Sequence, residues 1–181
     1  MPVPVERGGT QTWITEPILV VEYDPGWAAR AHMLIERLTA RLDLWLTDKI
    51  EHVGSTAVPG LSAKPVIDLM APVSSLDEAP AVEAALAPDL WHWLAPATDS
   101  LSAERRIFVQ VVDGQRSAHL HLAISGGRYW HEILLFRDRL LEDNQLADQY
   151  STLKRQLAVD APNRDAYTAG KSAFIARVIG R

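Results

Sequence analysis

The chain has 181 residues, 48% hydrophobic and 23% charged, a composition typical of a folded globular protein and unlike a disordered, collagen-like or coiled-coil chain. Eighteen lysines and arginines against 23 acidic residues give a formal net charge of −5, so no overall positive field attracts nucleic acid or an anionic membrane. The absence of cysteine excludes disulfides, thiolate nucleophiles and cysteine-bound zinc, and leaves histidines and carboxylates as the strong metal ligands.

The N-terminal residues 1–15 carry proline, glycine and threonine without a period, and we predict a flexible arm followed by one domain over residues 16–181. Glu6 and Arg7 stand where a signal peptide needs its apolar core. No stretch approaches the roughly 20 apolar residues of a membrane span. We therefore expect a cytoplasmic protein with no membrane partner.

The first half of the chain alternates short apolar runs with one clear helix. Residues 17–23 predict a strand that ends at Asp24, which is suited to cap a helix with Pro25 at its first position. Apolar residues then recur every three or four positions from Trp27 to Trp45, which predicts an amphipathic helix. Two further strands, a short helix and a segment that fits either structure follow at residues 50–53, 65–71, 79–87 and 90–94.

The second half begins with a predicted hairpin and ends in helices. The runs 106–112 and 118–124 are joined across Asp113-Gly114-Gln115, a turn signal. Helical periods follow over 130–141, 146–157 and 167–178, with Asn163 as a cap for the last. The chain therefore predicts an α+β fold, a mixed β-sheet flanked by helices with a helical C-terminal third.

Asp68 interrupts the apolar run Pro-Val-Ile-Asp-Leu-Met-Ala over residues 65–71. A carboxylate inside an apolar environment costs several kcal/mol unless a cation, a metal or several donors accompany it. Asp68 therefore either faces such a partner, or lies on the solvated face of an edge strand or caps a nearby helix.

His119 and His121 flank Leu120 on a predicted strand, where the period of two directs both imidazoles to one face. Two neighbouring imidazoles can bind one metal or shuttle protons. The alternative is a solvated polar face with Leu120 and Leu122 turned inward.

The loop that starts at Gly54 fits neither the P-loop nor the dinucleotide-binding pattern, because its glycine spacing differs and Leu61-Ser62 follows. The backbone N–H groups and hydroxyls of Gly54-Ser55-Thr56 can hold an anion or form an ordinary turn. Arg137 and Lys171 lie at core-facing positions of their helices. They either reach solvent with their charged ends or meet an anion in a cleft.

Six segments, in order and at matching spacing from about Val20 to the C-terminus, together resemble the GrpB family (UPF0157 type), which is also found fused to dephospho-CoA kinase. The longest segment combines the glycine-serine turn with the strand that carries Asp68. The segments are EHVGSTAVPGLSAKPVIDL at 51–69, YDPGW at 23–27, HLHL at 119–122, LFRD at 135–138, YSTLK at 150–154 and YTAGKSAFI at 167–175.

The resemblance implies a nucleotidyltransferase-like fold, whose enzymes transfer a nucleoside monophosphate from an NTP to an acceptor. Carried over by position, Gly54 and Ser55 become the phosphate turn and Asp68 the first metal carboxylate. The usual second carboxylate is replaced by Met70, and His119 or His121 stands where a third carboxylate is common. Since imidazole suits Mn²⁺, Zn²⁺ or Ni²⁺ better than Mg²⁺, the identity of the divalent metal stays open.

Three functions follow from these residues. The first is nucleotidyl or phosphoryl transfer from an NTP to an unknown small acceptor, with Asp68, His119 and His121 as catalytic and metal-binding residues. The second is a non-catalytic nucleotide- or metabolite-binding module linked to coenzyme A metabolism. The third is a metal-dependent hydrolase with His52 as an additional ligand. The residues expected to contact phosphate are Gly54, Ser55, Thr56, Lys64, Arg137 and Lys171.

Overall fold

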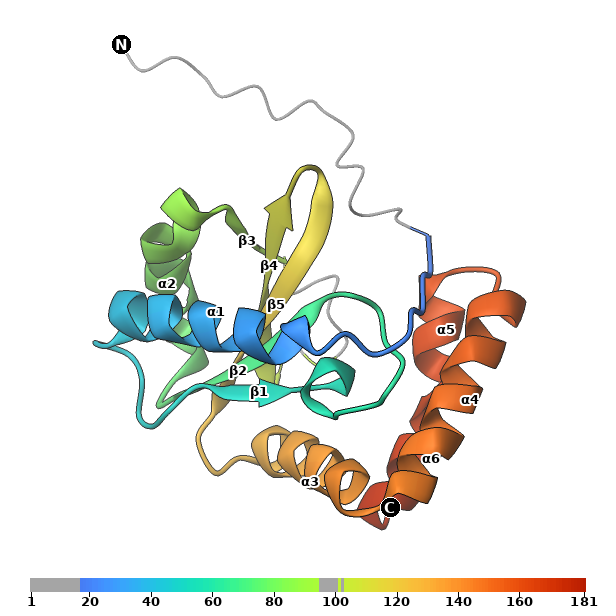
Figure 1. Ribbon diagram of the computed structural model, residues 1–181. Coiled ribbons are helices and arrows are strands. Elements are labelled where there is room, and N and C mark those ends of the chain that lie inside the picture. Colours follow the sequence, from blue (N-terminus) through green and yellow to red (C-terminus); the bar gives the residue numbers. More distant parts are fainter. Residues whose placement is uncertain (1–16, 95–100, 102) are drawn as a thin grey trace.

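A computed structural model of the chain describes residues 17–94, 101 and 103–181 (Figure 1). A five-stranded sheet has the order β1-β2-β5-β4-β3. β2 and β5 are parallel and the other neighbours antiparallel, so the sheet is mixed. The expected arm over residues 1–15 lies outside the described residues. The strands are β1 (Glu51–Val53), β2 (Ile67–Val73), β3 (Trp91–Trp93), β4 (Arg105–Val112) and β5 (Gln115–Ile124).

Helices cover both faces of the sheet, and α4 to α6 gather beside one end of it (Figure 1). The expected α+β class, with flanking helices and a helical C-terminal third, is confirmed. The helices are α1 (Gly26–Leu42), α2 (Ala79–Leu86), α3 (Arg128–Glu142), α4 (Asn144–Asp160), α5 (Arg164–Gly170) and α6 (Ser172–Ile179), and the 3₁₀ turns are η2 (Ser55–Ala57), η3 (Leu76–Glu78) and η4 (Ala87–Asp89). None of the helices in the described ranges combines the length and apolar character that a bilayer span requires.

The two faces of the sheet differ in chemistry because side chains alternate along each strand. Ile67 and Leu69 of β2 and Leu120 of β5 face α1 and α2 in the main core. The residues between them, Asp68 and His119, lie on the opposite face, where Tyr129 of α3 packs in a smaller core. The sheet therefore presents Asp68 and His119 to the α3 side.

The C-terminal helices are attached to the loop between η2 and β2. Val58 and Leu61 of that loop are buried with Leu140 of α3 and Tyr150 of α4 in a third apolar cluster. The Ser62 N–H also donates to the Ser151 hydroxyl at 3.2 Å. These contacts hold the turn at Ser55 close to α4.

Several element boundaries differ from the sequence prediction. The strand expected over residues 17–23 is wrong, because only Val21 pairs, in an isolated bridge with Ala63. Pro25, not Asp24, is the N-cap of α1, and the Asp24 carboxylate instead accepts from the Gly26 N–H at 2.8 Å. The ambiguous segment 90–94 contains strand β3.

The last predicted helix is divided into α5 and α6 by Lys171. Gly170 ends α5 in close contact with α4, since a Cβ at this position would lie 2.5 Å from Leu157 Cδ2. The Lys171 N–H bonds back to the Thr168 carbonyl at 3.3 Å, which closes a tight turn. The predicted cap is confirmed, because the Asn163 side chain accepts from the Ala166 N–H at 2.9 Å. The hairpin is also confirmed, with Asp113 and Gly114 at positive φ in a two-residue turn.

Candidate functional site

Asp68 lies on a central strand, paired with Val53 of β1 on one side and His119 of β5 on the other. The alternative of a solvated edge strand is therefore wrong. The Asp68 side chain is 30% exposed, so most of it is shielded from solvent.

Two imidazoles meet the Asp68 carboxylate. The His119 Nδ1 atom lies 2.9 Å from Asp68 Oδ1, and His121 Nε2 lies 3.8 Å from the same oxygen. Asp68, His119 and His121 each offer one atom that could bind a metal, and these three atoms all lie within 4.8 Å of one another. The parallel register of β2 and β5 produces this cluster by placing Asp68 beside His119, with His121 two residues further on the same face.

The cluster favours an ionised carboxylate beside a neutral imidazole. Burial raises the pKa of Asp68, but hydrogen bonding and charge from His119 and His121 outweigh it and hold that pKa far below its ordinary value. Burial also lowers the pKa of His121, against the opposing influence of Asp68. Ionised carboxylate and neutral imidazole are the forms that bind a metal.

The donor set fits a transition metal better than Mg²⁺. Mg²⁺ prefers an all-oxygen environment, whereas Mn²⁺, Zn²⁺ and Ni²⁺ accept imidazole. Met70, two residues after Asp68, is fully buried on the same face and pairs in register with His121. His119 Nε2 is buried without a hydrogen-bond partner among the described residues, so this ring lacks the outer support usual for a metal-binding histidine.

The glycine-serine turn lies directly against the carboxylate. Gly54 has φ +69°, and a Cβ built on it would stand 2.6 Å from Asp68 Oδ2. The next residue, Ser55, accepts a hydrogen bond from Lys154 Nζ at 2.9 Å. The residue that packs on Asp68 and the residue that bonds to Lys154 are therefore consecutive in the chain.

Lys154 of α4 is the site residue that reasoning from the sequence missed. It is only 2% exposed, and its ammonium group donates to Ser55 Oγ and to the Ser62 carbonyl and lies 4.7 Å from the centre of the Tyr150 ring. Burial, together with the positive charge of Lys171, lowers the pKa of Lys154 to about 7. Its spacing of four from Tyr150, on the buried side of α4, is the sequence signal that could have indicated it.

Lys171 belongs to the same group of charges. Its ammonium lies 4.6 Å from the centre of the Tyr167 ring, at the break between α5 and α6. Burial lowers the pKa of Lys171, and the negative charge of Asp68 raises it in part. Lys154 therefore contacts Ser55, and both Lys154 and Lys171 lie within electrostatic reach of Asp68.

Other predicted phosphate contacts have different surroundings. The Thr56 hydroxyl is buried and lies 3.0 Å from His52 Nε2. His52 pairs with Leu69 on the α1 side of the sheet, and it is not part of the described cluster of three metal-ligating residues. Lys64 is partly buried in the loop before β2.

Arg137 connects α3 to β1. Its guanidinium donates to Glu51 Oε2 at 2.7 Å, to Asp138 Oδ1 at 2.8 Å and to the His52 carbonyl at 3.0 Å. The side chains of Arg137 and Glu51 are 16% and 17% exposed. These contacts account for a core-facing arginine without any bound anion.

Replacing Arg137 with Gln is expected to reduce the free energy of unfolding by about 2 kcal/mol, because the largely buried Glu51 would keep only the exposed Lys49 as its cationic partner. Replacing Glu51 with Gln as well should recover part of this loss. Urea denaturation measures both effects. NTP affinity should not change in the single variant, and a tenfold weaker affinity would instead support the phosphate contact that the sequence suggests.

Replacing Gly54 with Ala is expected to displace the Asp68 carboxylate and to cost about 3 kcal/mol or more of stability, because the methyl group would add a collision to the strain of positive φ. Gly60 offers a matched control with φ +79° and nothing within 4 Å of its added Cβ. Gly60→Ala should cost about 1 kcal/mol. Thermal unfolding compares the two, and equal losses would contradict the close packing of Gly54 on Asp68.

Comparisons with known proteins agree with the described fold. The family model described as "GrpB protein" matches residues 17–181. A UPF0157 protein of Deinococcus radiodurans is 36% identical over 182 residues, which cover 98% of this chain and 88% of that protein. The crystal structure of GrpB from Enterococcus faecalis has a TM-score of 0.77 and 29% identity, covering 90% of this chain and 95% of that one.

One similar protein is larger. A dephospho-CoA kinase of Mycolicibacterium paratuberculosis is 33% identical over 182 residues, which cover 87% of this chain but only 44% of the kinase. The family model and the Deinococcus relative both extend over most of this chain. The chain therefore belongs to the GrpB family.

Proposed function

We propose that this protein is a nucleotidyltransferase-like enzyme that transfers a nucleotidyl or phosphoryl group from an NTP to a small acceptor with the help of a divalent metal. The observation that carries the proposal is the direct contact between a metal-type cluster and a cationic turn. Gly54 packs on the Asp68 carboxylate, and Ser55 next to it bonds to the buried Lys154.

The turn is suited to the phosphates of the NTP. Ser55 offers a hydroxyl, and Lys154 and Lys171 offer two ammonium groups with little competing solvent. Charge-assisted hydrogen bonds from such groups are strong, and they neutralise the negative charge that develops on the phosphates during transfer. Lys64, in the loop attached to the same turn, is proposed as a further contact.

The carboxylate and the two imidazoles would hold the metal. A metal bound by Asp68, His119 and His121 would supply charge neutralisation and orientation for in-line attack on phosphorus. The acceptor hydroxyl must lose its proton as its oxygen bonds to phosphorus and the leaving group departs, which is pyrophosphate in nucleotidyl transfer and a nucleoside diphosphate in phosphoryl transfer. If the metal binds Asp68 and only one of the two imidazoles, the other imidazole can take that proton.

In the second candidate function the protein binds a nucleotide but does not catalyse a reaction. Met70 leaves the cluster with a single carboxylate, which favours a module that binds a nucleotide or metabolite without turnover. The larger relative named dephospho-CoA kinase suggests coenzyme A metabolism as the setting. A hydrolase remains the third alternative, with the same three ligands and without His52.

Calorimetric titration with each NTP, in the presence and absence of Mn²⁺ or Mg²⁺, together with an assay for released pyrophosphate, nucleoside diphosphate and phosphate, tests the proposal. Transfer predicts metal-dependent binding and turnover once an acceptor is supplied. Tight binding without metal or turnover would support the binding module. Phosphate release to water alone would support the hydrolase.

A further inference from the structure

The second nitrogen of His121 faces two polar side chains that the proposed chemistry does not use. His121 Nδ1 lies 3.1 Å from the hydroxyl of Tyr129 and 3.3 Å from Arg105 Nη1. Arg105 Nη1 also donates to the Tyr129 hydroxyl at 2.6 Å. Both the imidazole and the phenol are largely buried, with 12% and 7% exposed.

These two neighbours of Nδ1 differ in what they can do with a proton. A guanidinium carries only donors, whereas a phenolic hydroxyl both donates and accepts. A phenolic oxygen has two lone pairs, so the hydrogen bond from Arg105 does not by itself prevent Tyr129 from accepting an N–H from His121, which lies 3.1 Å away. Arg105 can never receive that proton.

Two arrangements of the neutral imidazole follow. When Nδ1 accepts from Tyr129 or Arg105, the ring proton is on Nε2 and points toward Asp68 Oδ1, 3.8 Å away. When Nδ1 donates its proton to the Tyr129 oxygen, Nε2 presents a lone pair beside the carboxylate. Only the second arrangement places two electron-pair donors side by side, as a metal requires.

We propose that Tyr129 is a positioning residue that allows His121 to become a metal ligand. Its hydroxyl oxygen accepts a hydrogen bond from Nδ1–H of His121 when Nε2 binds the ion. This inference rests on the metal site of the proposed function. Without the hydroxyl, Arg105 would be the polar neighbour of Nδ1 among the contacts described here, and its N–H groups would keep the ring proton on Nε2. Arg105 therefore favours the form of His121 that cannot bind a metal through Nε2, and Tyr129 allows the form that can.

The test uses Co²⁺ alone, titrated into the purified protein and followed by its visible absorption. Tyr129→Phe keeps the ring that packs in the α3 core and removes only the hydroxyl. We expect Co²⁺ affinity to fall by about 10- to 100-fold, the usual effect of losing an outer partner of a metal ligand. The absorption band should also shift, because an imidazole ligand would be replaced by water.

A second substitution separates positioning from packing. Adding Arg105→Met to Tyr129→Phe removes the donor that holds the proton on Nε2, so the double variant should bind Co²⁺ more tightly than Tyr129→Phe alone. Tyr23→Phe serves as the matched control, since Tyr23 contacts Trp27 outside the site. Its affinity and spectrum should equal those of the wild type.

The outcomes are distinct. Tight Co²⁺ binding by the wild type with equal binding by Tyr129→Phe would overturn the role of Tyr129 and leave the metal site standing. A loss in Tyr129→Phe that the double variant does not recover would also overturn it, in favour of packing. No Co²⁺ binding by the wild type would overturn the proposed metal site itself, and the inference with it.

Discussion

Replacing Asp68 with Asn is expected to abolish specific metal binding and to reduce metal-dependent NTP turnover by on the order of a thousandfold or more. The amide has the shape of the carboxylate but not its charge. It would leave two imidazoles as the remaining members of the cluster. Mn²⁺ titration followed by calorimetry and pyrophosphate release measures the two effects.

The same substitution should change stability in acid. The pKa of Asp68 in the folded protein lies far below its ordinary value of 3.8, so the folded state favours the ionised form. This contribution is fully present above about pH 5 and is lost as the pH falls toward the lowered pKa. Asp68→Asn should therefore unfold at a lower denaturant concentration than the wild type at pH 7, with a smaller difference at pH 3.

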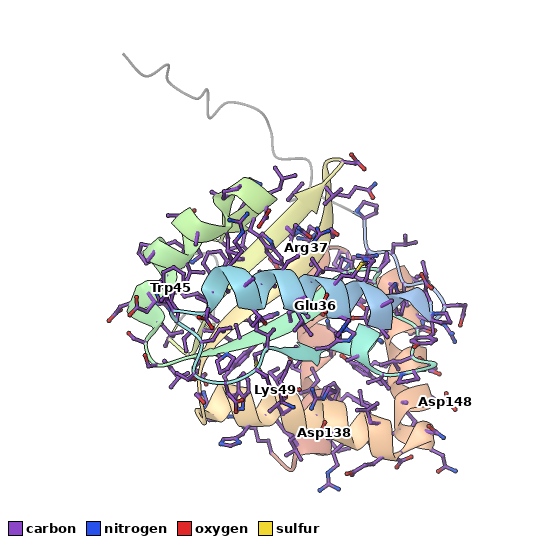
Figure 2. The ribbon with its side chains drawn as sticks, turned by 60° about the vertical axis from the view of Figure 1, so that its left-hand side comes forward. Glu36, Arg37, Trp45, Lys49, Asp138 and Asp148 are labelled. Carbon is purple, nitrogen blue, oxygen red and sulfur yellow. The ribbon has the colours of Figure 1, made fainter. Side chains whose placement is uncertain are left out.

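Asp148→Asn is the matched control for this prediction. Asp148 is exposed on α4 and lies at the outer side of that helix, away from the sheet (Figure 2). Its substitution removes the same charge and should leave metal affinity, turnover and stability unchanged. If Asp68→Asn retained wild-type turnover, the carboxylate would have no part in the reaction and the proposed centre would be wrong.

The sequence pattern predicted much of the site because burial and alternation leave local signals. Asp68 stood out among aliphatic neighbours, and the spacing of two placed His119 and His121 on one face. The pattern contained nothing about which strands are neighbours. The parallel pairing of β2 with β5 brings together residues 51 positions apart, and only tertiary structure sets that pairing.

The two cations predicted from the helical pattern illustrate the limit. A core-facing charge indicates that a partner exists, but it does not identify the partner. Arg137 meets Glu51, 86 residues earlier in the chain. Lys171 remains beside the proposed anion site at the turn between α5 and α6.

Lys154 is a buried charge that the helical pattern did not indicate. It lies among the buried positions of α4, where a lysine in sequence is easily taken for a side chain that extends to solvent. Its partners Ser55 and Ser62 belong to a loop more than 90 residues earlier. That long separation explains why no local pattern indicated the contact.

Replacing Lys154 with Met is expected to weaken NTP binding by roughly 30- to 100-fold, which corresponds to about 2 to 3 kcal/mol for a charge-assisted hydrogen bond. Methionine fills a similar volume and removes the ammonium group. The substitution should not reduce the free energy of unfolding at pH 7, because it also removes the cost of burying a charge. Calorimetry and urea denaturation measure these opposite responses.

Wild-type stability should depend on pH through the same residue. The pKa of Lys154 is about 7 in the folded protein and 10.5 ordinarily, so between these values the unfolded chain binds the additional proton. The contribution of Lys154 to the free energy of unfolding therefore rises with pH across this window, by about 1 kcal/mol per pH unit. The free energy of unfolding of the wild type minus that of Lys154→Met, measured at pH 7, 8 and 9, should therefore increase by about 1 kcal/mol per pH unit.

Proton uptake provides the most direct evidence that Lys154 meets the phosphates. A bound anion raises the pKa of Lys154, so NTP binding at pH 8 should take up a proton, and the measured enthalpy should vary with the ionisation enthalpy of the buffer. Lys154→Met should lose this dependence. Lys49→Met, which removes the same charge from a side chain that is 79% exposed, should keep it. Equal proton uptake by the wild type and Lys154→Met would show that the phosphates bind elsewhere.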